Sequence, residues 1–528
     1  MARFVNIDRD TPLLLPPGLR DWVESDHLVH FVIDAMDTVD TRAAAVNDRG
    51  TGSEQYPPTM LLALLVYSYA TGVFSSRQIE RSTYENVAVR LLCADTHPDH
   101  DTLCTFRRRN GALLTRALAQ VLELAANCGV LNVGKVTVAI DGTKVLANAS
   151  KHAAVSHGHA EKKLRELDLE IAELVAKAEQ ADATPLQDGL SIPVEIARRK
   201  ERKAKLAQAK AEIEARAHAR FVSEQATYSE KLAQRETLQS EGKKPPGRPP
   251  QPPTAAPEAK EQVNFTDEES RIMKTKDGFQ QAYNAQAGVE TDSRLIVGAR
   301  VTQAPNDKEQ LVPTLGAVCE HVTPAHVLVD SGYASEAAVT KVEREMPDLC
   351  VLAAMVREPH GRTVAQLEKK EEPPEPDADA PFGQRMRQRT TTTAGRALYK
   401  LRQQTVEPVF GIIKEAMGFR RFSLRGHKNV SLEWDLVCLA YNVKRLHRIG
   451  GAFGGIRGLH GGVKPVAPKS IGRLAARNLA LTALGSTLSW LKHIEKLLFV
   501  LLSRLPAHLQ PHWPKIRHLG IYLSPTGC

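Results

Sequence analysis

Hydrophobic and polar residues alternate differently in the first and the later parts of this chain. Up to about residue 130, apolar residues recur every three or four positions, as they do in amphipathic helices. From about residue 135 onward, shorter runs alternate with a period of two or are apolar throughout, as they are in strands. The pattern therefore predicts an all-helical domain over residues 1–130, followed by an α/β domain.

The helical domain contains a candidate DNA-reading element. An apolar helix over residues 57–72 stops at Gly72, and a second helix follows it directly. A third helix is expected to begin with Asp101 as its N-cap, and it carries Arg107, Arg108 and Arg109. Two helices joined at a glycine are compatible with a helix-turn-helix, in which these arginines would contact DNA. A helical bundle with a solvated basic face is the alternative, and this segment taken alone favours the bundle.

Two predicted strands end in an aspartate. In residues 135–141, alternating apolar residues lead to Asp141, and the apolar run 325–329 leads to Asp330. A hairpin over 281–302 and a helix over 307–320 lie between them. A helix, a strand over 348–356 and a helix with Glu407 come after Asp330. Three antiparallel strands followed by crossover strands and helices form an RNase H-like α/β core, which is the predicted fold class.

A charged helical segment interrupts this core. Leu164, Leu167, Ile171, Leu174 and Ala178 follow one another at steps of three and four, as in a coiled-coil seam. A second helical stretch runs to about residue 238, and a proline-rich linker spans 242–257. The pattern predicts an inserted helical hairpin with its linker over 157–260, within a core made of 131–156 and 261–447. Residues 368–382 read as an acidic loop, and 448–528 as a tail of unassigned role with an amphipathic helix at 488–505.

Composition excludes several classes of protein. The hydrophobic fraction of 42% suffices for a sizeable core, so a disordered chain is excluded. Seven scattered cysteines without a C-x-x-C pair favour reduced thiols over a disulfide framework or a zinc site. Neither a signal peptide nor a membrane helix is expected, which indicates a cytoplasmic protein. A net charge of +9 fits an acidic partner such as DNA, and equally a protein that binds nothing anionic.

Asp141, Asp330 and Glu407 are suited to metal-dependent phosphodiester chemistry. Cleavage without a protein nucleophile requires an activated water or 3′-hydroxyl and a stabilised leaving oxygen, which two divalent ions about 3.5–4 Å apart provide. Carboxylate oxygens are the ligands that Mg²⁺ prefers. Each residue alone is as well explained as a turn former or as a solvated acid in the first turn of a helix. All three in this order of elements favour a metal site.

The segment around Glu407 resembles a known family. Residues 399–414, YKLRQQTVEPVFGIIK, carry Tyr399, Arg402, Glu407 and Lys414. Bacterial insertion-sequence transposases of the DDE superfamily have a similar Tyr-x2-Arg-x3-Glu-x6-Lys signature around their third carboxylate. The likeness extends to IDGTKV and VLVDSGYAS, which hold the two aspartates, and covers roughly residues 5–130 and 135–447 apart from the insertion and the acidic loop.

The resemblance implies that the protein moves its own mobile element by cutting and joining DNA. It implies Mg²⁺, with Mn²⁺ as a substitute, held by Asp141, Asp330 and Glu407. The implied partners are double-stranded DNA, as element ends and as target, and a second copy of the chain in a homodimeric synaptic complex. The expected location is the bacterial cytoplasm, in association with the nucleoid. Tyr399, Arg402 and Lys414 are implied to contact the DNA.

One spacing differs from the signature. Arg402 and Glu407 are five residues apart where the signature has four, so on a continuous helix Arg402 is expected to point away from Glu407. The residue before a proline avoids helical geometry, so a break at Glu407-Pro408, with a helix beginning near Pro408, would absorb the shift. Lys414 lies seven residues after Glu407 and is expected to share its face and to grip a DNA phosphate.

A basic segment over residues 419–429 follows this helix. It is either a second set of phosphate contacts or a basic surface, and its closeness to the proposed site favours DNA for the residues Arg420, Arg421, Arg425 and Lys428. Two other functions stay open at this stage. One is an RNase H-like nuclease that cuts DNA without joining it, and the other is a DNA-binding relic without catalytic turnover.

Overall fold

The structure, a computed structural model, describes residues 18–46, 54–150, 153–181, 192–242, 244–245, 248–355, 372–377 and 380–450. The chain divides into two units, Met1–Ile456 and Arg457–Cys528, and all of the described residues belong to the first. The amphipathic helix predicted at 488–505, most of the unassigned tail and part of the acidic loop therefore lie outside the described residues. None of the described helices is long and apolar enough to cross a membrane.

The first part of the chain is helical, as predicted. Its elements are η1 (Leu19–Trp22), α1 (Leu28–Asp37), α2 (Pro58–Ala70), α3 (Ser76–Glu85), α4 (Val87–Leu92), α5 (His100–Arg109) and α6 (Gly111–Asn127). Every residue of α2 from Leu61 onward is buried, which explains its apolar sequence. The predicted N-cap of α5 was wrong by two positions: the cap is Asp99, whose carboxylate accepts a hydrogen bond from the Thr102 amide at 2.6 Å, whereas Asp101 is exposed in the first turn.

A six-stranded mixed sheet forms the centre of the second part. Its strands run in the order β4-β5-β1-β7-β8, and β6 also pairs with β5. The β1–β5, β4–β5 and β5–β6 pairs are antiparallel, whereas β1–β7 and β7–β8 are parallel. The strands are β1 (Lys135–Leu146), β4 (Arg271–Thr275), β5 (Gly278–Glu290), β6 (Ile296–Thr302), β7 (Thr323–Val329) and β8 (Cys350–Ala353). The prediction of a mixed α/β structure is confirmed.

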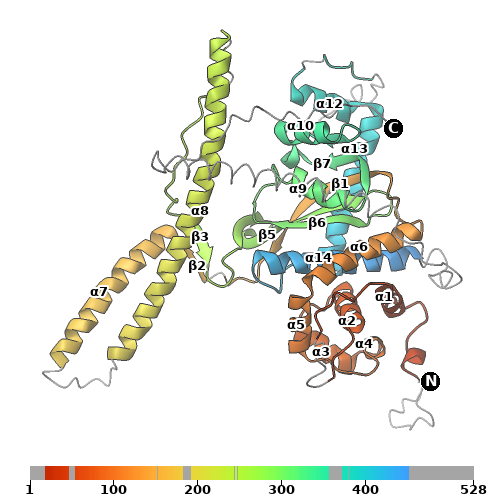
Figure 1. Cartoon of the computed structure of the whole chain (residues 1–528), viewed down its shortest axis with the longest axis horizontal. Helices are drawn as coiled ribbons and strands as arrows, with labels where there is room; N and C mark the ends of the chain where they lie inside the picture. Colours follow the sequence, from red (N-terminus) through yellow and green to blue (C-terminus); the bar gives the residue numbers. More distant parts are fainter. Residues whose placement is uncertain are drawn as a thin grey trace, which may run out of the picture. The chain divides into compact units, whose positions relative to one another are not determined.

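Helices and short turns connect and cover the sheet. They are α9 (Leu311–Cys319), η3 (Ser331–Tyr333), α10 (Glu336–Glu345), α12 (Phe382–Thr391), α13 (Thr393–Gly411), the π-helical turn η4 (Ile412–Ala416) and α14 (His427–Gly450). Helix α14 contacts β6 and also the N-terminal helices α2 and α6 (Figure 1). Its Trp434 donates to the Gln286 carbonyl of β5 at 3.0 Å. The N-terminal helices and the sheet consequently share one continuous hydrophobic core.

Between β1 and β4 the chain forms an antiparallel helical hairpin. Helices α7 (His157–Ala181) and α8 (Ile192–Ser240) lie side by side (Figure 1). Buried Leu167 packs against Leu206, and Arg199 pairs with Glu170 at 2.9 Å. At its base, strands β2 (Ala154–Ser156) and β3 (Gln262–Asn264) form a two-stranded ribbon. At 1.5 Å per residue, the 49 residues of α8 are roughly 70 Å long.

Candidate active site

Two strands bring Asp141 and Asp330 to one edge of the sheet. Asp330 directly follows β7. The prediction that the first strand ends at Asp141 was wrong, because β1 continues to Leu146 alongside β5. The pairing of β1 with β7, however, stops at Ala139, so Asp141 emerges just beyond the point where its parallel neighbour ends. The sheet edge that presents both aspartates is therefore created by the short β7.

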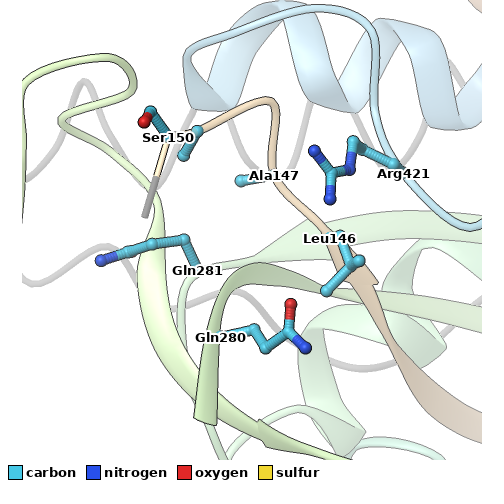
Figure 2. A pocket seen from close by; sticks show the side chains of 7 residues that line it. Leu146, Ala147, Ser150, Gln280, Gln281 and Arg421 are labelled. Atoms are coloured by element: carbon cyan, nitrogen blue, oxygen red, sulfur yellow. The ribbon is translucent and has the colours of Figure 1, made fainter. Parts of the chain in front are cut away.

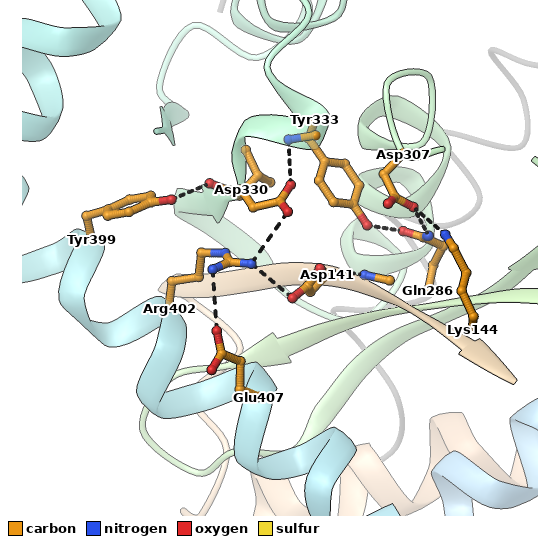
Figure 3. A network of polar contacts seen from close by, with 12 residues as sticks. Asp141, Lys144, Gln286, Asp307, Asp330, Tyr333, Tyr399, Arg402 and Glu407 are labelled. Atoms are coloured by element: carbon orange, nitrogen blue, oxygen red, sulfur yellow. Dashed lines mark hydrogen bonds and ion pairs between the residues drawn. The ribbon is translucent and has the colours of Figure 1, made fainter. Parts of the chain in front are cut away.

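Helix α13 carries the third predicted carboxylate and faces this edge (Figure 3). Arg402 Nη2 lies 3.0 Å from Asp141 Oδ2 and 3.9 Å from Asp330 Oδ2, and its Nη1 lies 3.7 Å from Glu407 Oε1. We call these four residues the acidic centre. The Tyr399 hydroxyl donates to the Val329 carbonyl at 3.0 Å and so ties α13 to the end of β7. Tyr399 and Arg402, both predicted to contact DNA, are thus engaged within the protein.

Two predictions about this helix were wrong. Helix α13 begins at Thr393 and continues through Pro408, so it neither begins nor breaks there. Arg402 does not point away from Glu407, because a five-residue separation rotates the side chains by about 140° and both are long enough to bridge that angle. The irregularity comes later, in the π-helical turn that holds Lys414.

Burial and the nearby arginine act on the pKa of Asp141 in opposite directions. Burial raises the pKa of Asp141 to about 6; the nearby Arg402 lowers it, and the neighbouring Asp330 and Asp307 add to the rise. The side chains of Asp330 and Glu407 are more open, with exposed fractions of 39% and 56%. Among the described residues, no group of three or more His, Cys, Asp or Glu side chains is close enough together to hold a metal ion. The three carboxylates nonetheless converge on one cation, the Arg402 guanidinium.

A polar cluster beside Asp141 was missed by the sequence analysis. Asp307 Oδ1 accepts hydrogen bonds from Asn284 at 2.7 Å and Gln286 at 2.8 Å, and it lies 3.7 Å from the Lys144 ammonium (Figure 3). Gln286 in turn accepts a hydrogen bond from the Tyr333 hydroxyl. Asp307 precedes a predicted helix and shows no motif of its own, so only contacts with residues more than 20 positions away reveal it.

Gly142 makes room for this cluster. A Cβ atom at Gly142 would collide with the Gln286 amide nitrogen and would lie 2.8 Å from both Asn284 Oδ1 and Asp307 Oδ1. The two residues of the Asp-Gly pair in β1 therefore have different roles. Asp141 faces the acidic centre, and Gly142 leaves space for the side chains of Gln286, Asn284 and Asp307.

Basic side chains gather after α13. Lys414 is half-buried and its Nζ donates to the Lys144 carbonyl at 3.0 Å; burial lowers its pKa, and the nearby Lys276 and Arg420 lower it further. Lys276 was not predicted from sequence. Glu415 is exposed and pairs with Arg420. The predicted DNA contacts that lie exposed on this segment are Arg420, Arg421, Arg425 and Lys428.

Residues 420–422 run beside the end of β1, since the Leu146 amide donates to the Arg420 carbonyl at 3.1 Å and the Phe422 amide to the Leu146 carbonyl at 2.9 Å. Arg421 borders a cavity of about 270 Å³, with Leu146, Ala147, Ala149, Ser150, Gln280 and Gln281 as its other lining residues (Figure 2). The main-chain bonds fix this basic segment to the sheet, next to the strand that carries Asp141.

One of the predicted DNA contacts is wrong. Arg107 is 4% exposed, and its Nη1 donates to the Tyr69 hydroxyl at 2.7 Å. Tyr69 donates to Glu433 at 2.9 Å, and Glu433 also accepts the amides of Ser423 and Leu424. We call Arg107, Tyr69 and Glu433 the buried relay. It joins α5 and α2 to α14, whereas Arg108 and Arg109 remain exposed.

Two family models match the chain. One, described as "Transposase DDE domain", matches residues 378–447, which include Tyr399, Arg402, Glu407 and Lys414. The other, described as "Transposase domain (DUF772)", matches residues 18–109, the stretch from η1 to α5. Both aspartates of the acidic centre lie between the two matched segments. No curated protein and no solved structure matches the chain.

Proposed function

We propose that the chain is a DDE transposase of an insertion sequence, which binds the ends of its own element, cleaves them and joins them to target DNA; the two matched transposase family models support this proposal. The observation that carries this proposal is the convergence of Asp141, Asp330 and Glu407 on a single cation. Carboxylates that meet at a sheet edge from separate elements form the oxygen donor set of a divalent metal site. The proposed cofactor is Mg²⁺, with Mn²⁺ as a substitute.

The proposed catalytic core is RNase H-like and consists of residues 131–156 and 261–447. Three antiparallel strands, β6, β5 and β1, followed by β7 and β8 parallel to β1, support this assignment. Residues 1–130 form the proposed DNA-binding domain, and 157–260 a proposed helical insertion whose two helices pack through the buried Leu167 and Leu206. Because α14 packs against α2 and α6, the first domain is fixed to the core rather than tethered to it.

The chain's own residues would bind and orient the reacting groups. Asp141, Asp330 and Glu407 would hold the metal, which activates the attacking oxygen and stabilises the leaving one. The Tyr399 hydroxyl and the Gly332 amide keep the end of β7 in place, so that Asp330 is pre-positioned. The buried donors around Asp307 hold the neighbouring strand rigid. Such pre-positioning lowers the reorganisation that the reaction requires.

The proposed DNA surface lies along the segment that follows α13. Exposed Arg420, Arg421, Arg425 and Lys428 would neutralise phosphates, together with Lys276 and Lys414. Arg108 and Arg109 offer further contacts on α5. Because two element ends must be held together, we propose that the active form is a homodimer, acting on nucleoid DNA in the bacterial cytoplasm.

Nicking of DNA that carries the element ends tests the proposal. The ends are found by searching the DNA that flanks the gene for short inverted repeats. We expect Asp141→Asn, Asp330→Asn and Glu407→Gln to reduce Mg²⁺-dependent nicking more than about a hundredfold, because each removes a ligand charge, while binding to the ends is kept. Lys414→Ala should weaken nicking. The matched control Glu415→Gln, on the same helical segment but exposed and outside the acidic centre, should be nearly silent.

The same assay separates the other two functions. Nicking without insertion of the cut end into target DNA would indicate a nuclease, and binding without Mg²⁺-dependent nicking by the wild-type chain would indicate a relic. Full activity in Glu407→Gln combined with loss in Glu415→Gln would contradict the assignment of the third carboxylate.

A further inference from the structure

The carboxylate oxygens of the acidic centre are not equivalent. Asp141 Oδ1 accepts the Gly142 amide at 2.8 Å, and Asp330 Oδ1 accepts the Gly332 amide at 2.8 Å. The second oxygen of each aspartate faces Arg402, as does one oxygen of Glu407. The oxygens that the main chain leaves open to a cation are therefore the ones that already face the guanidinium.

Arg402 is built into this position rather than resting on a surface. It is 8% exposed, and its Nε is buried without a hydrogen-bond partner. A guanidinium keeps its charge at any pH at which proteins are folded. A permanent charge placed among three carboxylates offsets their mutual repulsion, which a partly buried site would otherwise increase.

The contacts are nevertheless weak enough to be replaced. Only the contact with Asp141, at 3.0 Å, has the length of a hydrogen bond; those with Glu407 and Asp330 are 3.7 and 3.9 Å long. Asp330 and Glu407 are also substantially exposed, so a hydrated ion can reach them. At these separations, and with carboxylates that are open to water, the contacts of Arg402 with Asp330 and Glu407 contribute little to stability.

We infer that Arg402 is the resident cation of the acidic centre, and that a divalent metal and this guanidinium compete for the same oxygens. The inference rests on the metal site of the proposed function and adds a residue that regulates its loading. In the metal-free protein Arg402 neutralises the carboxylates and keeps them close together. When the metal binds, the guanidinium leaves the centre, so a phosphate contact by Arg402 becomes possible only after the metal is bound.

Binding of Mn²⁺ to the full chain without DNA tests this competition by a readout other than activity. We compare the wild type with Arg402→Gln by calorimetry and by the electron paramagnetic resonance of free Mn²⁺, and follow thermal unfolding with and without Mn²⁺. Arg402→Gln should bind Mn²⁺ about tenfold more tightly, because no resident charge has to be displaced. Its melting temperature should rise more on addition of Mn²⁺ than that of the wild type.

Equal or weaker Mn²⁺ binding by Arg402→Gln would overturn the inference and leave the proposed function intact, because the arginine would then only support the carboxylates. If neither protein bound Mn²⁺, the metal site of the proposed function would itself be wrong. Should Arg402→Gln not fold, Arg402→Met decides, because it also removes the resident charge while keeping most of the aliphatic stem: tighter Mn²⁺ binding is expected, and unchanged or weaker binding overturns the inference. Asp141→Asn, which removes a proposed ligand, should bind Mn²⁺ more weakly than the wild type.

Discussion

Among the residues that the structure describes, two nearly buried arginines, Arg107 and Arg402, neutralise carboxylates, and their surroundings differ. In the buried relay, Arg107 reaches Glu433 through the Tyr69 hydroxyl, and Glu433 is fully buried with its oxygens bonded to that hydroxyl and to two main-chain amides. In the acidic centre, Arg402 faces its carboxylates directly, yet two of the three contacts exceed 3.5 Å and two carboxylates are exposed by more than a third.

This difference indicates that the buried relay stabilises the fold, whereas the cation in the acidic centre can be exchanged. A buried carboxylate with all of its partners in place is costly to disturb, because any loss leaves a charge without compensation. A carboxylate open to water can exchange one cation for another at a small cost. The same two residue types thus hold the N-terminal helices to the core in one place and prepare a cation site in the other.

Replacing each arginine by methionine should show this difference most strongly. Arg107→Met should reduce the free energy of unfolding by about 3 kcal/mol, because Glu433 would lose its cation in a buried position. Arg402→Met should cost about 1 kcal/mol or less, and added Mn²⁺ should recover the loss. Urea unfolding of the metal-free chain measures both. Equal losses for the two variants would remove the distinction.

A smaller loss of stability is expected when the packing of β1 beside the acidic centre is disturbed. Gly142→Ala should lower the free energy of unfolding by about 2 kcal/mol, since the added Cβ meets Gln286, Asn284 and Asp307. Gly316→Ala in α9 is the control, because nothing lies within 4 Å of its Cβ and alanine favours a helix. Thermal unfolding should show opposite signs for the two variants. A neutral Gly142→Ala would mean that the cluster around Asp307 adapts freely.

Asp435 extends the comparison to a half-buried carboxylate whose partner is a hydroxyl group in place of an arginine. Burial raises its pKa to about 6; the Thr115 hydroxyl, which donates to it at 2.8 Å, partly offsets this, and the nearby Glu320 adds to the rise. A raised folded-state pKa means that the charged form destabilises the fold above pH 6, and that this penalty fades as the pH falls from 6 toward 4. Asp435→Asn should therefore stabilise the protein by about 1 kcal/mol at pH 8 and hardly at all at pH 4.5. A gain that does not change with pH would refute this explanation.

Local patterns predicted much of the fold. Alternating apolar residues located β1 and a continuous apolar run located β7. The predicted order of β1, β5, β6, α9, β7, α10 and β8 agrees with the structure, whereas strand β4 and helix α12 were not predicted. The heptad-like stripe in the insertion predicted its packing face, since Leu167 is buried while its neighbours Asp168 and Leu169 are exposed. These predictions succeed because the period of the apolar residues is set by the geometry of each element, which a short segment determines by itself.

The candidate site was only partly predictable. Asp141, Asp330 and Glu407 were selected from sequence, and the structure brings them to one point; their role as metal ligands stays a prediction. The orientation of Arg402 was predicted wrongly because a rotation of about 140° on a continuous helix was expected to separate it from Glu407, whereas both side chains are long enough for Arg402 Nη1 to lie 3.7 Å from Glu407 Oε1. Asp307 and Lys276 carry no motif, so only their neighbours in space reveal them.

The sequence by itself determined which segments form helices and strands, which faces are apolar, and that carboxylates follow two of the strands. The tertiary structure alone decided which charges meet. The sequence does not distinguish the three consecutive arginines of α5, yet packing buries Arg107 and leaves Arg108 and Arg109 exposed. Arg402 and Asp141 are 261 positions apart, and Tyr69 and Glu433 are 364 apart. Pairing over such separations depends on how whole helices and strands pack around a shared core. The local periodicity of apolar residues carries no information about that packing.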